Sequence, residues 1–117
     1  MTNEELNKWL AEKVMGYIPG ESIGYASAWY FKKSANNIYE TVIPISAWNP
    51  TEDRNQMARC VKELPENKQT AYLGNLMEIC TGYEDWDEAS WENMFSLVEA
   101  SPRQRAEALY KTISEMP

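Results

Sequence analysis

The sequence contains no histidine and only two cysteines and five glycines. Without histidine, the chain cannot form a Ser-His-Asp triad, a typical catalytic zinc site or a histidine-based pH switch. The glycine-rich phosphate loops GxGxxG and GxxxxGK[ST] are also absent. We therefore expect a protein that is not an enzyme and that carries no metal or other cofactor.

The two cysteines, Cys60 and Cys80, lie twenty positions apart in apolar patterns of helical spacing. This placement is typical of free thiols in a reducing compartment rather than of a disulfide. The N-terminus lacks the basic start and apolar run of a secretory signal, and no stretch approaches the length of a membrane span. We expect a cytoplasmic protein that stays in the cytosol where it is made, with no membrane contact.

The chain has 117 residues, of which 44% are hydrophobic and 25% charged, proportions typical of a globular protein. This length predicts a single domain over 1–117, large enough for one ordinary hydrophobic core. The formal net charge is −7, and no basic stripe is present. Phosphate repulsion would oppose nucleic-acid binding by such a chain, so we expect no direct contact with nucleic acid.

Three helices are predicted from capping signals and apolar periodicity. The first covers 3–15, where Thr2 and Glu5 fit a capping box. The second covers 52–64, with Thr51 as its expected cap. The third covers 102–115, because Ser101 and Gln104 fit another capping box. The apolar spacing over 66–80 favours a further helix, with a strand as the open alternative, and 83–100 is ambiguous.

Two runs read as strands. Residues 25–33 are rich in aromatic side chains, 38–45 are rich in β-branched ones, and turn-forming residues lie between them. Pro44 cannot donate a main-chain hydrogen bond, so the second strand either ends there or presents that position to an open edge. The predicted fold is α+β, with a small antiparallel sheet built on this hairpin, 25–33 and 38–45, layered between the α-helices.

Trp29, Tyr30 and Phe31 are consecutive. Side chains alternate along a strand, so at least one of these rings must lie on the face opposite its neighbours. Either helices cover both faces of the hairpin, or an aromatic patch is left for a partner. One hypothesis places Trp29, Tyr30 and Trp48 around a ligand pocket between sheet and helix.

The negative charge is concentrated in one segment. Residues 1–82 hold ten acids and eight bases, and 101–117 hold two acids and three bases, whereas 83–100 hold six acids and no base. That segment therefore accounts for −6 of the net charge of −7. Its acids alternate with tryptophan and tyrosine, which bury area while presenting a polar edge.

One interpretation of the acidic segment is a solvated loop and helix start. A second is a docking face for a partner protein with a basic surface. The residues of this expected partner-binding face are Tyr83, Glu84, Asp85, Trp86, Asp87, Glu88 and Glu92. A calcium loop is disfavoured, because EF-hand spacing counted from Asp85 puts Ser90 where glycine is required.

Three short motifs carry a resemblance to a known family. They are the run Ala11 to Tyr17 (AEKVMGY), the run Trp48 to Asp53 (WNPTED), and Ala100 to Arg103 (ASPR) with Ala106 and Leu109. In this order they resemble the small bacteriophage proteins of the phage ABA sandwich domain family. Residues 66–99 depart from that pattern, being acidic where a strand would be expected. The resemblance implies a layered α/β/α fold and a phage or prophage origin, with no catalytic residues to carry over.

The leading hypothesis is a non-enzymatic phage protein that inhibits a host factor through its acidic and aromatic segment. The target would be a CRISPR or other nucleic-acid-handling defence complex. An alternative is a small-ligand sponge or sensor that uses the aromatic pocket. A third hypothesis is a structural phage protein that associates with copies of itself through a sheet edge or an aromatic patch.

Overall fold

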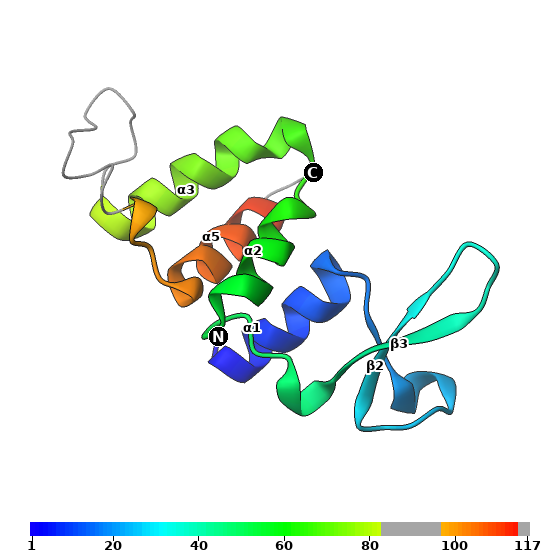
Figure 1. The fold of residues 1–117 in the computed structure, drawn as a ribbon. Helices are drawn as coiled ribbons and strands as arrows, with labels where there is room; N and C mark the ends of the chain where they lie inside the picture. Colours follow the sequence, from blue (N-terminus) through cyan, green and yellow to red (C-terminus); the bar gives the residue numbers. More distant parts are fainter. Residues whose placement is uncertain (83–96, 115–117) are drawn as a thin grey trace. The chain divides into compact units, whose positions relative to one another are not determined.

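The computed structural model describes residues 1–82 and 97–114. Over these residues it contains four α-helices and a three-stranded antiparallel sheet, which confirms the α+β fold (Figure 1). The chain divides into two compact units, 1–49 and 50–117, and each is described by itself below. The expectation of a single domain over 1–117 stays a prediction.

The first unit begins with helix α1, Asn3–Trp9, which continues as a π-helical turn over Leu10–Val14. Both bonds of the predicted capping box are present, between Thr2 and Glu5 in each direction. The helical segment ends at Gly16, whose φ of +70° is easily adopted only by glycine. The prediction of a helix over 3–15 is therefore confirmed in extent, but the widening to π geometry was not predicted.

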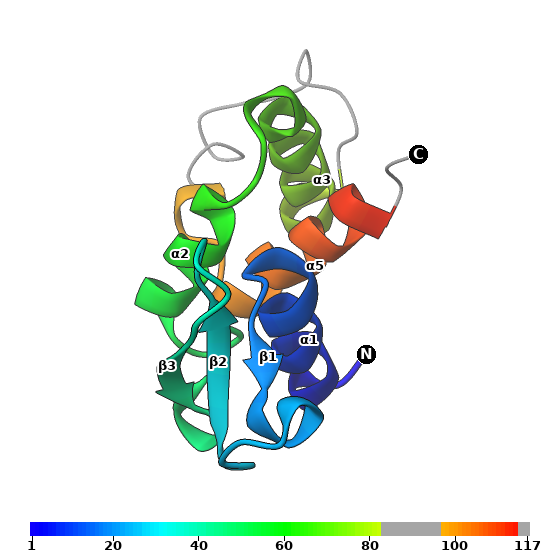
Figure 2. The same ribbon diagram turned by 90° about the vertical axis from the view of Figure 1, so that its right-hand side faces the viewer.

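The sheet consists of β1 (Ile18–Pro19), β2 (Trp29–Lys33) and β3 (Tyr39–Pro44), with β2 in the centre (Figure 2). The predicted hairpin of β2 and β3 is confirmed, and its turn is closed by Asn37 at a φ of +62°. The hairpin starts at residue 29 rather than 25, because residues 25–28 form a bend and turn before the ladder begins. The two-residue β1 was not predicted, since it is too short to show alternation.

The consecutive aromatic residues of β2 are covered on both faces of the sheet. Tyr30 packs near Tyr17, with ring centres 6.0 Å apart, on one face. Phe31 points to the opposite face, where the Tyr25 ring lies 5.2 Å away. Tyr30 and Phe31 are thus both buried, while Trp29 stays 37% exposed. Tyr30 and Phe31 are therefore covered, but the ring over Phe31 comes from the bend at Tyr25 and not from a helix as predicted.

The second unit holds α2 (Arg54–Lys62), α3 (Gln69–Thr81) and α5 (Pro102–Ser114). The expectation that Thr51 caps α2 is wrong. Asp53 occupies the N-cap, and its carboxylate accepts a 3.0 Å hydrogen bond from the main-chain N–H of Gln56. Helix α2 consequently starts two residues later than predicted. Thr51 lies before the helix, and its side chain is buried rather than capping the first turn.

Helix α3 resolves the alternative left open over 66–80, because the segment is helical and not a strand. It lies against α5, where Asn75 Nδ2 donates to Thr112 Oγ1 at 2.9 Å and Lys111 Nζ lies 2.7 Å from Glu78 Oε2. The predicted capping box at the start of α5, between Ser101 and Gln104, is present in both directions. α3 and α5 therefore form a helical pair in this unit.

The two cysteines are free thiols, as predicted. Cys60 is fully buried on α2, and Cys80 is half-buried on α3. Burial raises the pKa of Cys60 to about 12, and burial also raises the pKa of Cys80. Both thiols are therefore protonated at neutral pH, and neither is an activated nucleophile.

Candidate functional site

The expected partner-binding face lies outside the residues that the structure describes. It comprises Tyr83, Glu84, Asp85, Trp86, Asp87, Glu88 and Glu92, all within 83–96. The described structure therefore leaves the docking hypothesis as a prediction. The candidate site that the structure does describe is a cavity in the first unit.

This cavity has a volume of about 310 Å³, close to the lower end of the range for small-molecule sites. It brings together Tyr30 and Trp48, two of the three residues predicted for the ligand pocket. Trp29 is not part of its lining, because its side chain alternates with that of Tyr30 along β2. The complete lining is Glu4, Asn7, Lys8, Tyr30, Ile45 and Trp48.

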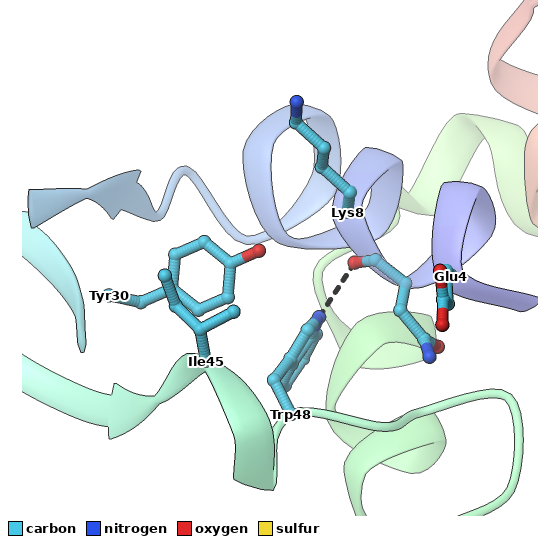
Figure 3. A pocket seen from close by; sticks show the side chains of 6 residues that line it. Glu4, Lys8, Tyr30, Ile45 and Trp48 are labelled. Atoms are coloured by element: carbon cyan, nitrogen blue, oxygen red, sulfur yellow. Dashed lines mark hydrogen bonds between the residues drawn. The ribbon is translucent and has the colours of Figure 1, made fainter. Parts of the chain in front are cut away.

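Trp48 forms a fixed wall of this cavity. Its indole Nε1 donates a 2.7 Å hydrogen bond to the main-chain oxygen of Asn7 in α1 (Figure 3). The Asn7 side chain in turn donates to Asn49 Oδ1 at 2.9 Å. Tyr17 packs edge-on against the indole, with ring centres 5.3 Å apart. These contacts hold the indole in one orientation without needing a ligand.

Tyr30 supplies a polar group at the wall. The residue is 4% exposed, and its hydroxyl is directed toward α1 in Figure 3. Within residues 1–82 and 97–114, no hydrogen bond to this hydroxyl is formed. Burial raises the pKa of Tyr30, and the charge of Glu12 adds to that rise. The hydroxyl is therefore neutral at physiological pH and is able to donate or accept a hydrogen bond.

Opposite charges lie at the rim of the cavity. Glu4 and Lys8 are four residues apart on α1, so both side chains reach the same face of the helix. This is the favourable order for an ion pair, yet neither forms one among the described residues. The ammonium group of Lys8 extends away from the Tyr30 and Trp48 rings (Figure 3). The rim thus offers one anion and one cation to an occupant.

Sequence reasoning found the aromatic members of the site but missed Glu4, Asn7, Lys8 and Ile45. The spacing of Glu4 and Lys8 was a usable signal, because it places both on one face of a predicted helix. Ile45 belongs to a short 3-10 turn, Ile45–Ala47, which follows β3. Its approach to α1 depends on the direction that the chain takes after Pro44. Pro44 is a local signal for the end of β3 but not for that direction.

In the part of the chain that the structure describes, no group of three cysteine, aspartate or glutamate side chains is placed to hold a metal ion. None of the described helices combines the length and apolar character needed to span a membrane.

The lining groups of the cavity are suited to holding an organic molecule by ring contacts, one hydrogen bond and rim charges.

No protein-family model, curated protein or solved structure matches this chain. The resemblance to the phage ABA sandwich domain family therefore stays a prediction from the three motifs. The functional argument depends on the geometry of the site itself.

Proposed function

We propose that this protein is a non-enzymatic binding protein that holds a small amphipathic organic molecule in the Tyr30–Trp48 cavity. The observation that carries this proposal is the Tyr30 hydroxyl, which borders the cavity without a protein hydrogen bond among the described residues. A polar group on a largely apolar wall is usually satisfied by a partner, so a ligand or a water molecule is the expected one.

The shape and chemistry of the wall favour a single flat ring with a polar substituent. Tyr30, Ile45 and Trp48 provide an apolar surface, and aromatic rings of this kind bind other rings in edge-on or offset contact. A substituent that reaches the Tyr30 hydroxyl would complete its hydrogen bonding. This corresponds to the ligand sponge or sensor hypothesis, with Glu4 and Lys8 at the rim in place of Trp29.

The experiment is an NMR titration of the full chain with phenol and with indole. Both are small, neutral aromatic compounds that carry one polar group. We expect both to shift the main-chain amide signals of Tyr30, Ile45 and Lys8 in a saturable manner. Tyr30→Phe, which removes only the hydroxyl, is expected to weaken phenol binding by about five- to tenfold, the usual value of one hydrogen bond.

A matched pair of variants separates filling of the cavity from general destabilisation. Ile45→Trp places a large ring in the cavity and is expected to abolish the shifts. Ile38→Trp adds the same ring at a position that is 58% exposed and outside the lining, so binding is expected to be unchanged. Equal binding by both variants would contradict the proposal. If only Ile45→Trp loses binding, mass spectrometry after incubation with cell extract would identify the natural ligand.

We also propose, as a second function, inhibition of a host protein with a basic surface by the acidic segment. The observation that favours it is the concentration of −6 charge in residues 83–100, with no lysine or arginine among them. Concentrated charge accelerates encounter with an oppositely charged partner, and aromatic side chains then supply anchoring contacts. A CRISPR or other nucleic-acid-handling defence complex presents such basic surfaces.

The test of this second function is a pull-down from host lysate at low and high salt. Neutralising Glu84, Asp85, Asp87 and Glu88 to their amides is expected to slow association and reduce its salt dependence. The control neutralises Glu21, Glu40, Glu63 and Glu66, four exposed carboxylates elsewhere. If both variants retained the same partner equally, the acidic segment would have no role in binding.

A further inference from the structure

A second cavity, of about 330 Å³, lies in the unit formed by residues 50–117. Arg54, Ala58 and Val61 line it from α2, where their spacing of four and three residues places them on one face. Arg105 lines it from α5. The cavity thus combines two guanidinium groups with a short apolar floor.

Neither guanidinium is neutralised within the described part of the chain. The ion pairs there join Arg103 to Glu107 and Lys111 to Glu78, and they leave Arg54 and Arg105 without a carboxylate. Two neighbouring positive charges with no counter-charge among residues 1–82 and 97–114 repel each other, and a bound anion would relieve that repulsion.

The hydrogen bonds of the two arginines go to main-chain oxygens and are long. Arg54 donates to the Ala100 oxygen at 3.4 Å, and Arg105 donates to the same oxygen at 3.3 Å. Arg105 also donates to Leu97 and Val98, at 3.2 and 3.3 Å. A guanidinium has five donors, so Arg54 retains four that these contacts do not use.

Arg105 has a structural role besides lining the cavity. Its bonds to Leu97, Val98 and Ala100 satisfy carbonyl groups before α5 begins. It also lies near the buried hydroxyl of Tyr72. Burial raises the pKa of Tyr72, and the Arg105 guanidinium opposes that rise, first as a hydrogen-bond donor and then through its charge. Arg54, which is exposed whereas Arg105 is half-buried, is therefore the better position for testing anion binding.

We propose that this cavity is a binding site for a small organic anion, a carboxylate or phosphate monoester attached to a compact apolar group. The anion would accept hydrogen bonds from the Arg54 and Arg105 guanidinium groups, whose planar donor arrangement matches carboxylate and phosphate oxygens. The apolar group would contact Ala58 and Val61. This site is separate from the Tyr30–Trp48 cavity and does not depend on the function proposed for it.

The experiment is an NMR titration of the full chain with benzoate and with phenyl phosphate, and with benzamide as the neutral analogue of benzoate. Inorganic phosphate tests whether the apolar group is needed. We expect the two organic anions to shift the amide signals of Ala58 and Val61, and to bind at least about tenfold more tightly than benzamide or inorganic phosphate. Binding is expected to weaken as salt concentration rises.

Arg54→Gln is expected to weaken benzoate binding by about tenfold, and Arg59→Gln, an exposed cation on the same helix, to leave it unchanged within about twofold. Ala58→Trp fills the cavity from an exposed position and is expected to abolish binding. Benzamide binding as tightly as benzoate, equal effects of the two glutamine variants, or no saturable shift with any probe would each overturn the proposal.

Discussion

The indole Nε1 of Trp48 donates a 2.7 Å hydrogen bond to the main-chain oxygen of Asn7, which lies forty-one residues earlier in the chain (Figure 3). This bond joins the segment after β3 to α1 at the turn directly before α1 widens to π geometry. It also fixes the indole as a wall of the candidate ligand cavity. One side chain therefore serves both the stability of the first unit and the shape of its site.

Trp48→Phe is expected to lower the free energy of unfolding by about 1–2 kcal/mol, because it removes the donor and leaves the ring contacts largely in place. Trp48→Ala, which also creates a cavity, is expected to cost about 3–5 kcal/mol. Urea unfolding measures both. Trp29→Phe is the control, since Trp29 is 37% exposed, and should change stability by less than about 0.5 kcal/mol. A Trp48→Phe variant as stable as the Trp29→Phe variant would show that the bond contributes nothing.

Gly20→Ala is expected to destabilise the first unit by about 3 kcal/mol, because a Cβ there would clash with the Ala26 oxygen and lie 2.8 Å from the Phe31 ring. The main chain over 20–26 would have to move away from β2. Gly24→Ala is the matched variant, since Gly24 has a φ of +74° but no atom within 4 Å of its Cβ position. It should cost only about 1–2 kcal/mol, from backbone strain alone. Thermal unfolding distinguishes the two, and the reverse order would contradict the described packing.

Asp53→Ala is expected to cost about 1 kcal/mol, because it removes the acceptor that caps α2 through the Gln56 N–H. Asp53→Asn keeps a side-chain oxygen at that position and should retain most of the stability. Asn55→Ala, at an exposed position within α2, controls for general effects of alanine. Chemical denaturation of the three variants provides the comparison. An Asp53→Ala variant no less stable than Asn55→Ala would mean that the helix does not depend on this cap.

The two thiols are expected to differ in their reaction with a disulfide reagent at pH 8. Cys80 is half-buried and should react slowly, whereas Cys60 is fully buried, has a pKa raised to about 12, and should react only after unfolding. Counting labelled thiols by mass spectrometry, with and without urea, tests this. Rapid labelling of Cys60 in the native protein would contradict its burial.

The raised pKa of Cys60 also predicts how stability depends on pH. The folded state holds the thiol proton more tightly than the unfolded state, so the Cys60 contribution is fully present below pH 9.0, the ordinary thiol value. It is lost as the pH rises from 9.0 toward about 12. A Cys60→Ala variant should therefore lose less stability over that interval than the wild-type protein. Parallel losses in the two proteins would argue against thiol ionisation as the cause.

Local signals in the sequence predicted most of the elements, because each signal acts within one turn or one strand pair. The capping boxes at Thr2 and Ser101 marked two helix starts correctly, and the turn over 34–37 marked the hairpin. The start of α2 was predicted two residues early, since Thr51 and Asp53 are both good capping residues. Asp53 is the N-cap, whereas the Thr51 side chain is buried. The burial of Thr51 cannot be predicted from the neighbouring residues alone.

The candidate site was predicted only in part. Tyr30 and Trp48 were selected as aromatic residues near a strand and a turn, and the structure brings them together. Trp29 was selected with them, but strand alternation points it away from Tyr30. The Arg54 and Arg105 cavity was not predicted, because its members come from two helices about fifty residues apart and share no motif.

By itself, the sequence determined the approximate positions of α1, α5 and the hairpin, the free thiols and the absence of histidine chemistry, since these depend on composition, periodicity and neighbouring residues. Only the tertiary structure decided which aromatic rings share a face, where α1 widens to π geometry, and which charged groups line each cavity. Those properties arise from contacts between residues far apart in the chain, and such contacts are set by packing rather than by local preference.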